Sequence, residues 1–223
     1  MLNRFSNKVS PIYDLIKQRV SQSSLIGVDE TGIKVNDDNH WFWAWQTPKL
    51  TFTAHAPNRK AESITALFPK GFPNSTLVHD RWKPQLNTPA KNHQTCFAYL
   101  QRHLIYLNKV HPDSTRGNSF LKLPYQSLEL TPKPKQKDYC IERTKIIQAL
   151  EDSLINLPDK NHKKLQTFYR HISRERQQLF IFIFIEKVPP DNNALERAIR
   201  NVKVKQKISG QFKTEQTRKT SPK

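Results

Sequence analysis

The sequence predicts an α/β domain in which helices flank a mixed sheet, and three observations support this class. Three strand-like runs follow one another near the N-terminus with only short turns between them. A helical segment then precedes a fourth strand-like run, as in a crossover connection onto the same sheet. Helical patterns dominate the rest of the chain.

The first elements are a helix and a three-stranded meander. An amphipathic helix is expected at residues 12–20, where the polar run SQSS ends the pattern. The runs LIGVDETGIKV (25–35), HWFWAWQT (40–47) and LTFTAHA (50–56) are rich in β-branched and aromatic residues. NDDN and PK between them are typical turn residues, so an antiparallel meander is predicted.

A crossover helix and two further strands complete the predicted sheet. RKAESITALF (59–68) has a helical pattern, and STLVHD (75–80) reads as a short buried strand that ends in Asp80. HQTCF (93–97) is expected to form a fifth strand, followed by a helix at 98–110. The residues on the apolar face of that helix are Leu100, Leu104 and Leu107.

Loops and helices are expected in the next part of the chain. Residues 112–137 contain four prolines and many lysines, which predicts a loop. Helices are predicted at 138–156 and 160–186. The second of these includes LFIFIFI (179–185), a run for which local rules also allow a strand.

The charge balance predicts a polyanionic partner. Lysine and arginine total 37 against 19 acidic residues, which gives a formal net charge of +18 and a pI near 10.0. Nucleic acid is favoured because no amphipathic membrane anchor is found. A basic protein with no specific partner is the alternative.

Other classes of protein are disfavoured. The longest apolar run has seven residues, whereas a membrane helix needs about 20. The N-terminus has no signal-peptide pattern, so a cytoplasmic protein is expected. Cys96 and Cys140 are too far apart to indicate a disulfide framework or a four-cysteine zinc site.

Two acidic residues occupy predicted strand positions. Asp29 follows the apolar run at the start of the first strand, and Asp80 ends the fourth. A carboxylate beside a buried strand costs free energy unless it is paired, hydrogen-bonded or bound to metal. Either acid alone fits an ordinary strand end or sheet edge, but neighbouring strands would bring the two together as a site for Mg²⁺. A third acid is then expected.

Glu196 is the candidate for that third acid, and its segment allows a purely structural interpretation as well. With Asn193 as helix cap, Glu196 would occupy the capping-box position, and Arg200 one turn later would pair with it. From this segment alone the structural interpretation is favoured. The residues of the apolar face leave Glu196 beside them: Leu195, Ala198, Ile199 and Val202.

Four motifs of this sequence resemble those of a known family. They are VDETGIKV (28–35), LVHDRW (77–82), HQTCFAYLQRHLIYL (93–107) and VPPDNNALERAIRNVKVKQKISGQF (188–212). Together they resemble the transposases of the insertion sequence sixty-six type, which carry a DDE triad on an RNase H-like core. The resemblance spans roughly residues 25–214, and the last motif is its most specific part.

The resemblance implies a function and a site. Asp29, Asp80 and Glu196 match the family's triad and would be both catalytic residues and metal ligands. Two Mg²⁺ ions, for which Mn²⁺ can substitute, would support DNA strand cleavage and strand transfer. The implied partners are the double-stranded DNA of transposon ends and target, with a homo-oligomer forming on that DNA. The implied location is cytoplasmic and nucleoid-associated.

A basic run after Glu196 is the predicted DNA contact. Lys203, Lys205 and Lys207 alternate with other residues, so an extended run would place all three on one side to meet phosphates. A solvated face is the alternative. Further candidates for DNA contact or for support of the site are Asn192, Asn193, Arg197 and Arg200.

The expected layout has four segments. They are an N-terminal helical remnant (1–24), an RNase H-like core (25–110), a loop and helical insertion (111–186), and the third-carboxylate helix with a basic tail (187–223). Family members typically carry a DNA-recognition region before the core and a further helix after it, so a chain truncated at both ends is expected, and an inactive fragment fits these residues too. A non-catalytic DNA-binding remnant and an RNase H-like nuclease stay open as alternatives.

Overall fold

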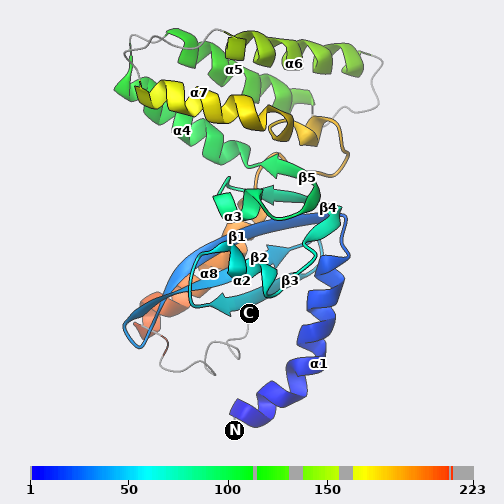
Figure 1. Cartoon of the computed structure of the whole chain (residues 1–223), viewed down its shortest axis with the longest axis vertical. Coiled ribbons are helices and arrows are strands. Elements are labelled where there is room, and N and C mark those ends of the chain that lie inside the picture. The colour runs from blue at the N-terminus through cyan, green and yellow to red at the C-terminus, as the bar shows by residue number, and fades with distance from the viewer. Residues whose placement is uncertain (1, 113–114, 131–137, 156–162, 211, 213–223) are drawn as a thin grey trace. The chain divides into compact units, whose positions relative to one another are not determined.

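The chain folds into two compact units in a computed structural model (Figure 1). The structure describes residues 2–112, 115–130, 138–155, 163–210 and 212. The first unit consists of Met1–His93 and Asn192–Lys223, and the second of Gln94–Asp191. Each unit is described on its own below.

The predicted mixed sheet is confirmed. Its strands are β1 (Leu25–Val35), β2 (Asp38–Gln46), β3 (Thr51–Ala56), β4 (Phe72–His79) and β5 (Ala90–Thr95), in the order β3-β2-β1-β4-β5. β1 pairs antiparallel with β2, and β2 with β3, so the meander is present. β1 pairs in parallel with β4, as the predicted crossover requires. This arrangement, with helices beside the sheet, is consistent with an RNase H-like α/β fold.

The turn between β1 and β2 follows directly from its sequence. Asn36 and Asp37 have φ values of 48° and 68°, and the flanking residues Val35 and Asp38 are paired. Two consecutive residues with positive φ form the kind of hairpin turn whose twist matches that of the strands. Asn and Asp tolerate this left-handed region better than other side chains, which explains why NDDN ends the first strand.

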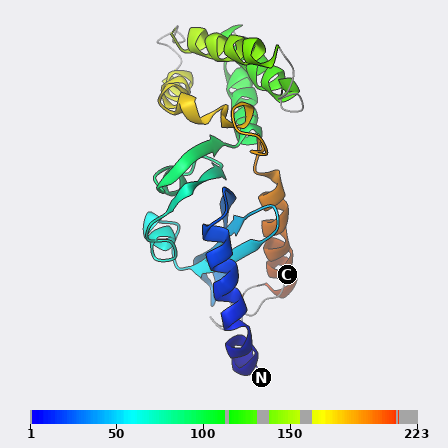
Figure 2. The ribbon, with the colours of Figure 1, turned by 90° about the vertical axis from the view of Figure 1, so that its right-hand side faces the viewer.

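The meander places alternate side chains on opposite faces of the sheet, and each face is covered by a different helix (Figure 2). Trp43 and Trp45 of β2 belong to the large core on the side of α1 (Leu2–Ser21). Ala44 between them packs with Leu195 on the side of α8 (Asn193–Ser209). Bulky residues on one face and a small one on the other let α8 lie close to the strands.

Aromatic side chains form the core on the α1 side. Trp43 and Trp45 stack with ring centroids 5.9 Å apart, and Phe68 meets Trp45 edge to face at 5.1 Å. The Tyr13 hydroxyl of α1 donates to the Thr53 carbonyl of β3 at 2.8 Å. Two short helices border this unit, α2 (Ala61–Thr65) within the predicted helical segment and α3 (Lys83–Leu86) after β4.

The start of α8 is fixed on β1 by a close backbone approach. The side-chain nitrogen of Asn192 donates to the Val28 carbonyl at 3.1 Å. A Cβ atom on Gly27 would come within 2.6 Å of the Asn192 Oδ1 atom, so only glycine leaves room for this contact. The predicted cap, Asn193, is wrong by one residue, since Asn192 is the cap and its side chain bonds to the strand.

The second unit is helical. Its helices are α4 (Phe97–Val110), α5 (Thr115–Leu130), α6 (Tyr139–Ile155) and α7 (Lys163–Glu175). The predicted apolar face of α4 is confirmed, because Leu100, Leu104 and Leu107 are all buried.

The loop predicted for residues 112–137 is wrong where α5 runs through it. Residues 113–114 and 131–137 of that range lie outside the described residues. Leu123, Ser127 and Leu130 are buried at helical spacing. Packing of this face outweighs the proline and lysine content that suggested a loop.

The helix predicted for residues 160–186 is wrong beyond Glu175. Two 3₁₀ turns, Arg176–Gln178 and Ile181–Ile183, follow α7 instead, and residues 160–162 lie outside the described part of the chain. The buried side chain of Gln94 explains the change. It donates to the Leu179 carbonyl at 2.9 Å and accepts from the Phe182 amide at 3.0 Å, so it satisfies backbone groups that a helix would have paired internally.

Within the described residues, no helix is long and apolar enough to cross a membrane. Cys96 is buried, Cys140 is exposed, and neither forms a disulfide within the described residues.

Candidate active site

Asp29 and Asp80 lie at the carboxyl ends of two neighbouring parallel strands. Gly27 of β1 is level with Val78 of β4 in the parallel register. Two residues further along each strand come Asp29 and Asp80, and Asp80 follows directly after the end of β4. Side chains two residues apart on a strand share a face, so both acids belong to the face that α8 covers. Ligand sites of open α/β sheets commonly lie at this kind of edge.

The environment of Asp29 raises its pKa to about 7. Burial is the largest cause, and the Asp80 carboxylate is the next. Glu30 and Glu196 raise the pKa further, while the Glu30 amide, which donates to Asp29 Oδ1 at 2.8 Å, opposes them. The negative charges of the acids from β1, from the end of β4 and from α8 therefore act on one another.

Glu196 lies in the first turn of α8, one turn after the Asn192 anchor. Its amide donates to the Asn192 carbonyl at 3.1 Å, and its side chain is half-buried. Because Asn192 is the cap, Leu195 rather than Glu196 occupies the capping-box position, so the predicted position of Glu196 relative to the cap is wrong by one residue. The charge of Glu196 is one of those that raise the pKa of Asp29.

The turn that carries Asp80 is held by its own neighbours. Asp80 Oδ1 accepts from the Trp82 amide at 3.2 Å, and Arg81 between them has a φ of 75°. The Arg81 amide donates to His79 Nδ1 at 3.1 Å, so the proton of His79 must be on Nε2, which donates to His93 Nδ1 at 3.0 Å. Burial lowers the pKa of His79 to about 3, so this ring stays neutral.

A fourth acid, Glu30, was not singled out from the sequence. It is buried on the opposite face of β1 from Asp29, where its carboxylate pairs with Arg59 and accepts from the Gln85 side chain. Burial raises the pKa of Glu30, and the Arg59 guanidinium opposes this. The signal was present in the sequence, because an acid at a core position of a strand needs a partner as much as Asp29 does.

The sequence matches a model of a known protein family. The family model described as "Transposase IS66 family" matches residues 1–220.

This chain belongs to the IS66 family of transposases.

Among curated proteins no match was found.

The three predicted acids of the transposase have the ligand chemistry that a divalent cation prefers. Carboxylate oxygens are hard ligands of the type that Mg²⁺ and Mn²⁺ prefer, and a cation would offset the repulsion that raises the pKa of Asp29. Among the described residues, no group of three histidine, cysteine or acidic side chains is already arranged as a metal cage. Metal binding would therefore have to draw the carboxylates closer together.

The basic run of the transposase is helical, so the prediction of an extended run is wrong. α8 continues through Ser209. Lys203 and Lys207 are one turn apart, whereas Lys205 is rotated by about 200° from Lys203, on the other side of the helix. The Lys203 ammonium donates to the Gly32 carbonyl of β1. Helical packing of Leu195 and Ile199 overrides the alternation that suggested a strand.

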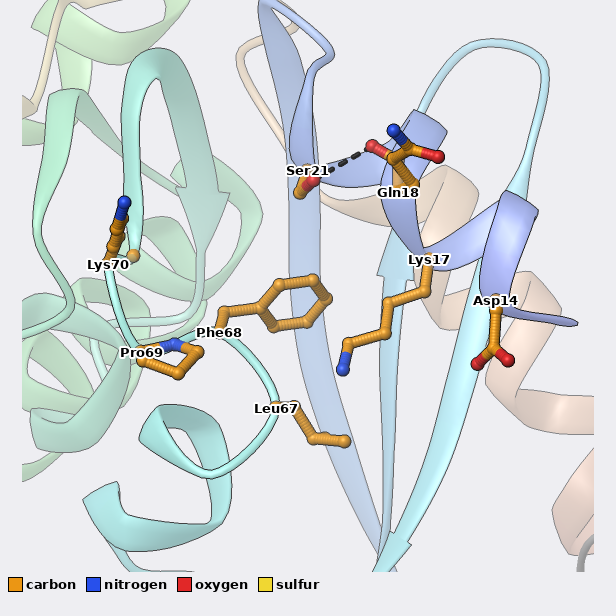
Figure 3. A pocket seen from close by; sticks show the side chains of 9 residues that line it. Asp14, Lys17, Gln18, Ser21, Leu67, Phe68, Pro69 and Lys70 are labelled. Carbon is orange, nitrogen blue, oxygen red and sulfur yellow. Dashed lines mark hydrogen bonds between the residues drawn. The ribbon is translucent and has the colours of Figure 1, made fainter.

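A hollow on the α1 side lies away from the acids. Its volume is about 480 Å³, and it lies between α1 and the segment before β4 (Figure 3). The Lys17 ammonium lies 5.7 Å from the centre of the Phe68 ring. The lining contains none of the three predicted carboxylates, so it does not belong to the candidate active site.

Proposed function

We propose that this transposase cleaves DNA and joins DNA strands with a DDE triad formed by Asp29, Asp80 and Glu196. The observation that carries the proposal is electrostatic. Burial and, after it, the carboxylates of Asp80, Glu30 and Glu196 raise the pKa of Asp29 to about 7, so acids from a strand end and from a helix start both act on an acid of the central strand. Perturbed carboxylates of this kind cluster at functional sites, and a chain with a net charge of +18 suits a DNA substrate.

Each carboxylate would act as a metal ligand rather than as a nucleophile. Asp29 is carried by a central strand of the sheet, Asp80 is held by the Trp82 amide, and Glu196 follows the Asn192 anchor. Two divalent ions, when bound, would activate water or a 3′-hydroxyl and stabilise the entering and leaving oxygens of the phosphodiester. The protein would supply the oxygen donors from elements that pack together in the first unit.

The exposed side of α8 is the proposed path of the DNA backbone. Arg197, Arg200 and Lys207 are exposed and lie on one side of the helix by their spacing of three and seven residues. Such residues would contact phosphates and add affinity without reading sequence. Asn192, which is buried against β1, would instead support the helix that carries Glu196.

The decisive experiment measures cleavage and strand transfer on DNA that contains the ends of the element. Activity should require Mg²⁺ or Mn²⁺ and should fall by at least 1,000-fold (on the order of 4 kcal/mol of transition-state stabilisation) in Asp29→Asn, Asp80→Asn and Glu196→Gln. Asp38→Asn, which removes an exposed acid at the start of β2, is the matched control and should keep full activity.

Three outcomes would contradict the proposal. Activity that survives all three substitutions would remove the triad from the mechanism. Salt-sensitive DNA binding without any turnover would favour a non-catalytic DNA-binding protein. Preferential cleavage of an RNA–DNA hybrid in a parallel assay would favour an RNase H-like nuclease.

A further inference from the structure

A cluster of stacked and charged side chains lies beside the proposed triad in the first unit. The Arg59 guanidinium lies 3.9 Å from the centre of the Trp82 ring and 4.9 Å from that of Trp41. Its other contact is the ion pair with Glu30, whose side chain is completely buried. The Trp82 indole N–H donates to the Arg59 carbonyl at 3.2 Å. Arg59 is thus held by its side chain and by its backbone.

The cluster is connected to both proposed aspartates through neighbours in sequence. Glu30 follows Asp29 on β1, and its amide donates to the Asp29 carboxylate. Trp82 lies two residues after Asp80, and its amide donates to the Asp80 carboxylate. Arg59 bridges Glu30 and Trp82. Its guanidinium pairs with the Glu30 carboxylate and stacks on the Trp82 ring, and its carbonyl accepts from the Trp82 indole N–H.

The buried polar groups of this cluster indicate that it does more than stabilise the fold. Gln85 donates to the Glu30 carboxylate although its own Oε1 is buried and makes no hydrogen bond among the described residues. A buried unpaired oxygen costs free energy, so the orientation of Gln85 is set by the needs of Glu30. A buried ion pair is also seldom worth more than an apolar pair of the same size. Stability of the fold alone therefore does not account for the cluster.

We propose that Arg59 is a positioning residue for the metal-binding carboxylates, which fixes the turn after β4 against β1 through Glu30 and Trp82. The inference rests on the proposed function of Asp29 and Asp80 as ligands. The planar guanidinium is required, since it stacks on an indole while its Nε and Nη2 groups both contact one carboxylate oxygen, Glu30 Oε1, and a lysine ammonium cannot do both. Supporting residues of this kind typically change metal affinity by about 10–100-fold.

The first measurement needs no metal. Hydrogen exchange of the Trp82 amide, which is bonded to Asp80, reports how firmly the turn is held. Arg59→Lys should reduce the protection of this amide by at least tenfold (on the order of 1.4 kcal/mol) in the metal-free protein. Lys60→Ala, which changes the exposed neighbouring cation, is the control and should leave the protection unchanged.

The second measurement is Mn²⁺ affinity by calorimetry. Arg59→Lys should bind Mn²⁺ about 10–100-fold more weakly than the wild type. Trp82→Phe keeps a ring for stacking but loses the indole N–H, so it should retain more affinity than Trp82→Ala. Arg59→Ala would leave the buried Glu30 carboxylate without its cation and would destabilise the fold. The double variant Glu30→Gln/Arg59→Gln has no buried charge, so a loss of Mn²⁺ affinity in this variant is not explained by unfolding.

The two measurements separate failure of this inference from failure of the proposed function. If Asp80→Asn abolishes Mn²⁺ binding while the Arg59 variants and the double variant bind like the wild type, the inference is overturned and the triad stands. Suppose that wild-type protein does not bind Mn²⁺ but Arg59→Lys still lowers the hydrogen-exchange protection of the Trp82 amide. The metal role of the triad then fails, and the positioning of Asp80 by Arg59 stands. If Arg59→Lys leaves the hydrogen-exchange protection of the Trp82 amide unchanged, Arg59 does not position the turn after β4.

Discussion

At the scale of single residues, the candidate site holds carboxylates of like charge near one another, which lowers the stability of the fold. The pKa of Asp29 is raised to about 7, mainly by burial and by the Asp80 carboxylate. Without a cation it therefore takes up a proton near neutral pH, which weakens the repulsion with Asp80 and Glu196. The proposed role of Asp29 as a metal ligand therefore requires a charge that lowers the stability of the metal-free fold, as is common at catalytic sites.

The pKa of Asp29 predicts how stability depends on pH in metal-free protein. The folded value is about 7 and the unfolded value about 3.8, so the folded state binds the proton more tightly. The free energy of unfolding should therefore fall as pH rises from about 4 through 7. Asp29→Asn should stabilise the fold at pH 8 by ~1–2 kcal/mol, allowing for partial exposure to solvent, and by much less at pH 4.

Urea denaturation at the two pH values checks this. Asp38→Asn is the control, because its carboxylate is exposed in the turn region and its removal should shift both curves equally. Equal stabilisation by Asp29→Asn at pH 4 and pH 8 would contradict the prediction.

At the scale of elements, the sequence was most informative where the periodicity of a segment matched its burial. The meander followed from its β-branched and aromatic runs, and the apolar face of α4 from Leu100, Leu104 and Leu107. The run LFIFIFI was misjudged because Gln94, 85 residues before Leu179, captures its backbone groups, and no local rule includes a partner so distant. The basic run was misjudged because alternation of lysines is compatible with helix and strand alike.

The contact between Gly27 and Asn192 predicts a strong coupling between β1 and α8. Gly27→Ala should destabilise the protein by ~2 kcal/mol, because its new Cβ would overlap the Asn192 Oδ1 atom. In an Asn192→Ala background the same change should cost less than ~0.5 kcal/mol, because the overlapping atom is absent. Chemical denaturation of the four proteins gives the coupling, and additive effects would show that the two residues do not share this contact.

The helical form of the basic run predicts different roles for its cations. Arg200→Gln and Lys207→Gln should each lower DNA affinity and reduce the slope of log K against log salt by about one. Lys203→Gln should have a smaller effect on that slope, because its ammonium already donates to the Gly32 carbonyl. Lys49→Gln, in the exposed turn between β2 and β3, is the control. Equal slopes for all four variants and wild type would contradict the assignment of this face to DNA.

At the scale of the whole molecule, the three proposed ligands all belong to the first unit. The second unit, Gln94–Asp191, is inserted in the sequence between Asp80 and Glu196. The three acids were predicted from the motifs that carry the family resemblance, of which the last is the most specific. The contacts among Glu30, Arg59 and Trp82 could not be predicted, since these residues meet only in the folded chain.

This division predicts where a bound metal ion acts. Mn²⁺ should increase hydrogen-exchange protection in β1, in the turn after β4 and in the first turn of α8, because a ligand stabilises the segments that bind it. Peptides from α5 and α6 should not change. Exchange measured by mass spectrometry with and without Mn²⁺ checks this, with Asp80→Asn as the control that should show no protection. Equal protection in both units would contradict a site confined to the first.

The anchoring of α8 on β1 also has a consequence in time. The bond from Asn192 to Val28 joins residues 164 positions apart, and Glu196 follows Asp80 by 116 residues. At a synthesis rate of about 5–20 residues per second, a nascent chain carries two of the three acids for roughly 6–23 seconds before the third is made. Until Glu196 has been made, a nascent chain therefore lacks one of the three proposed ligands, and the proposed DNA chemistry cannot begin.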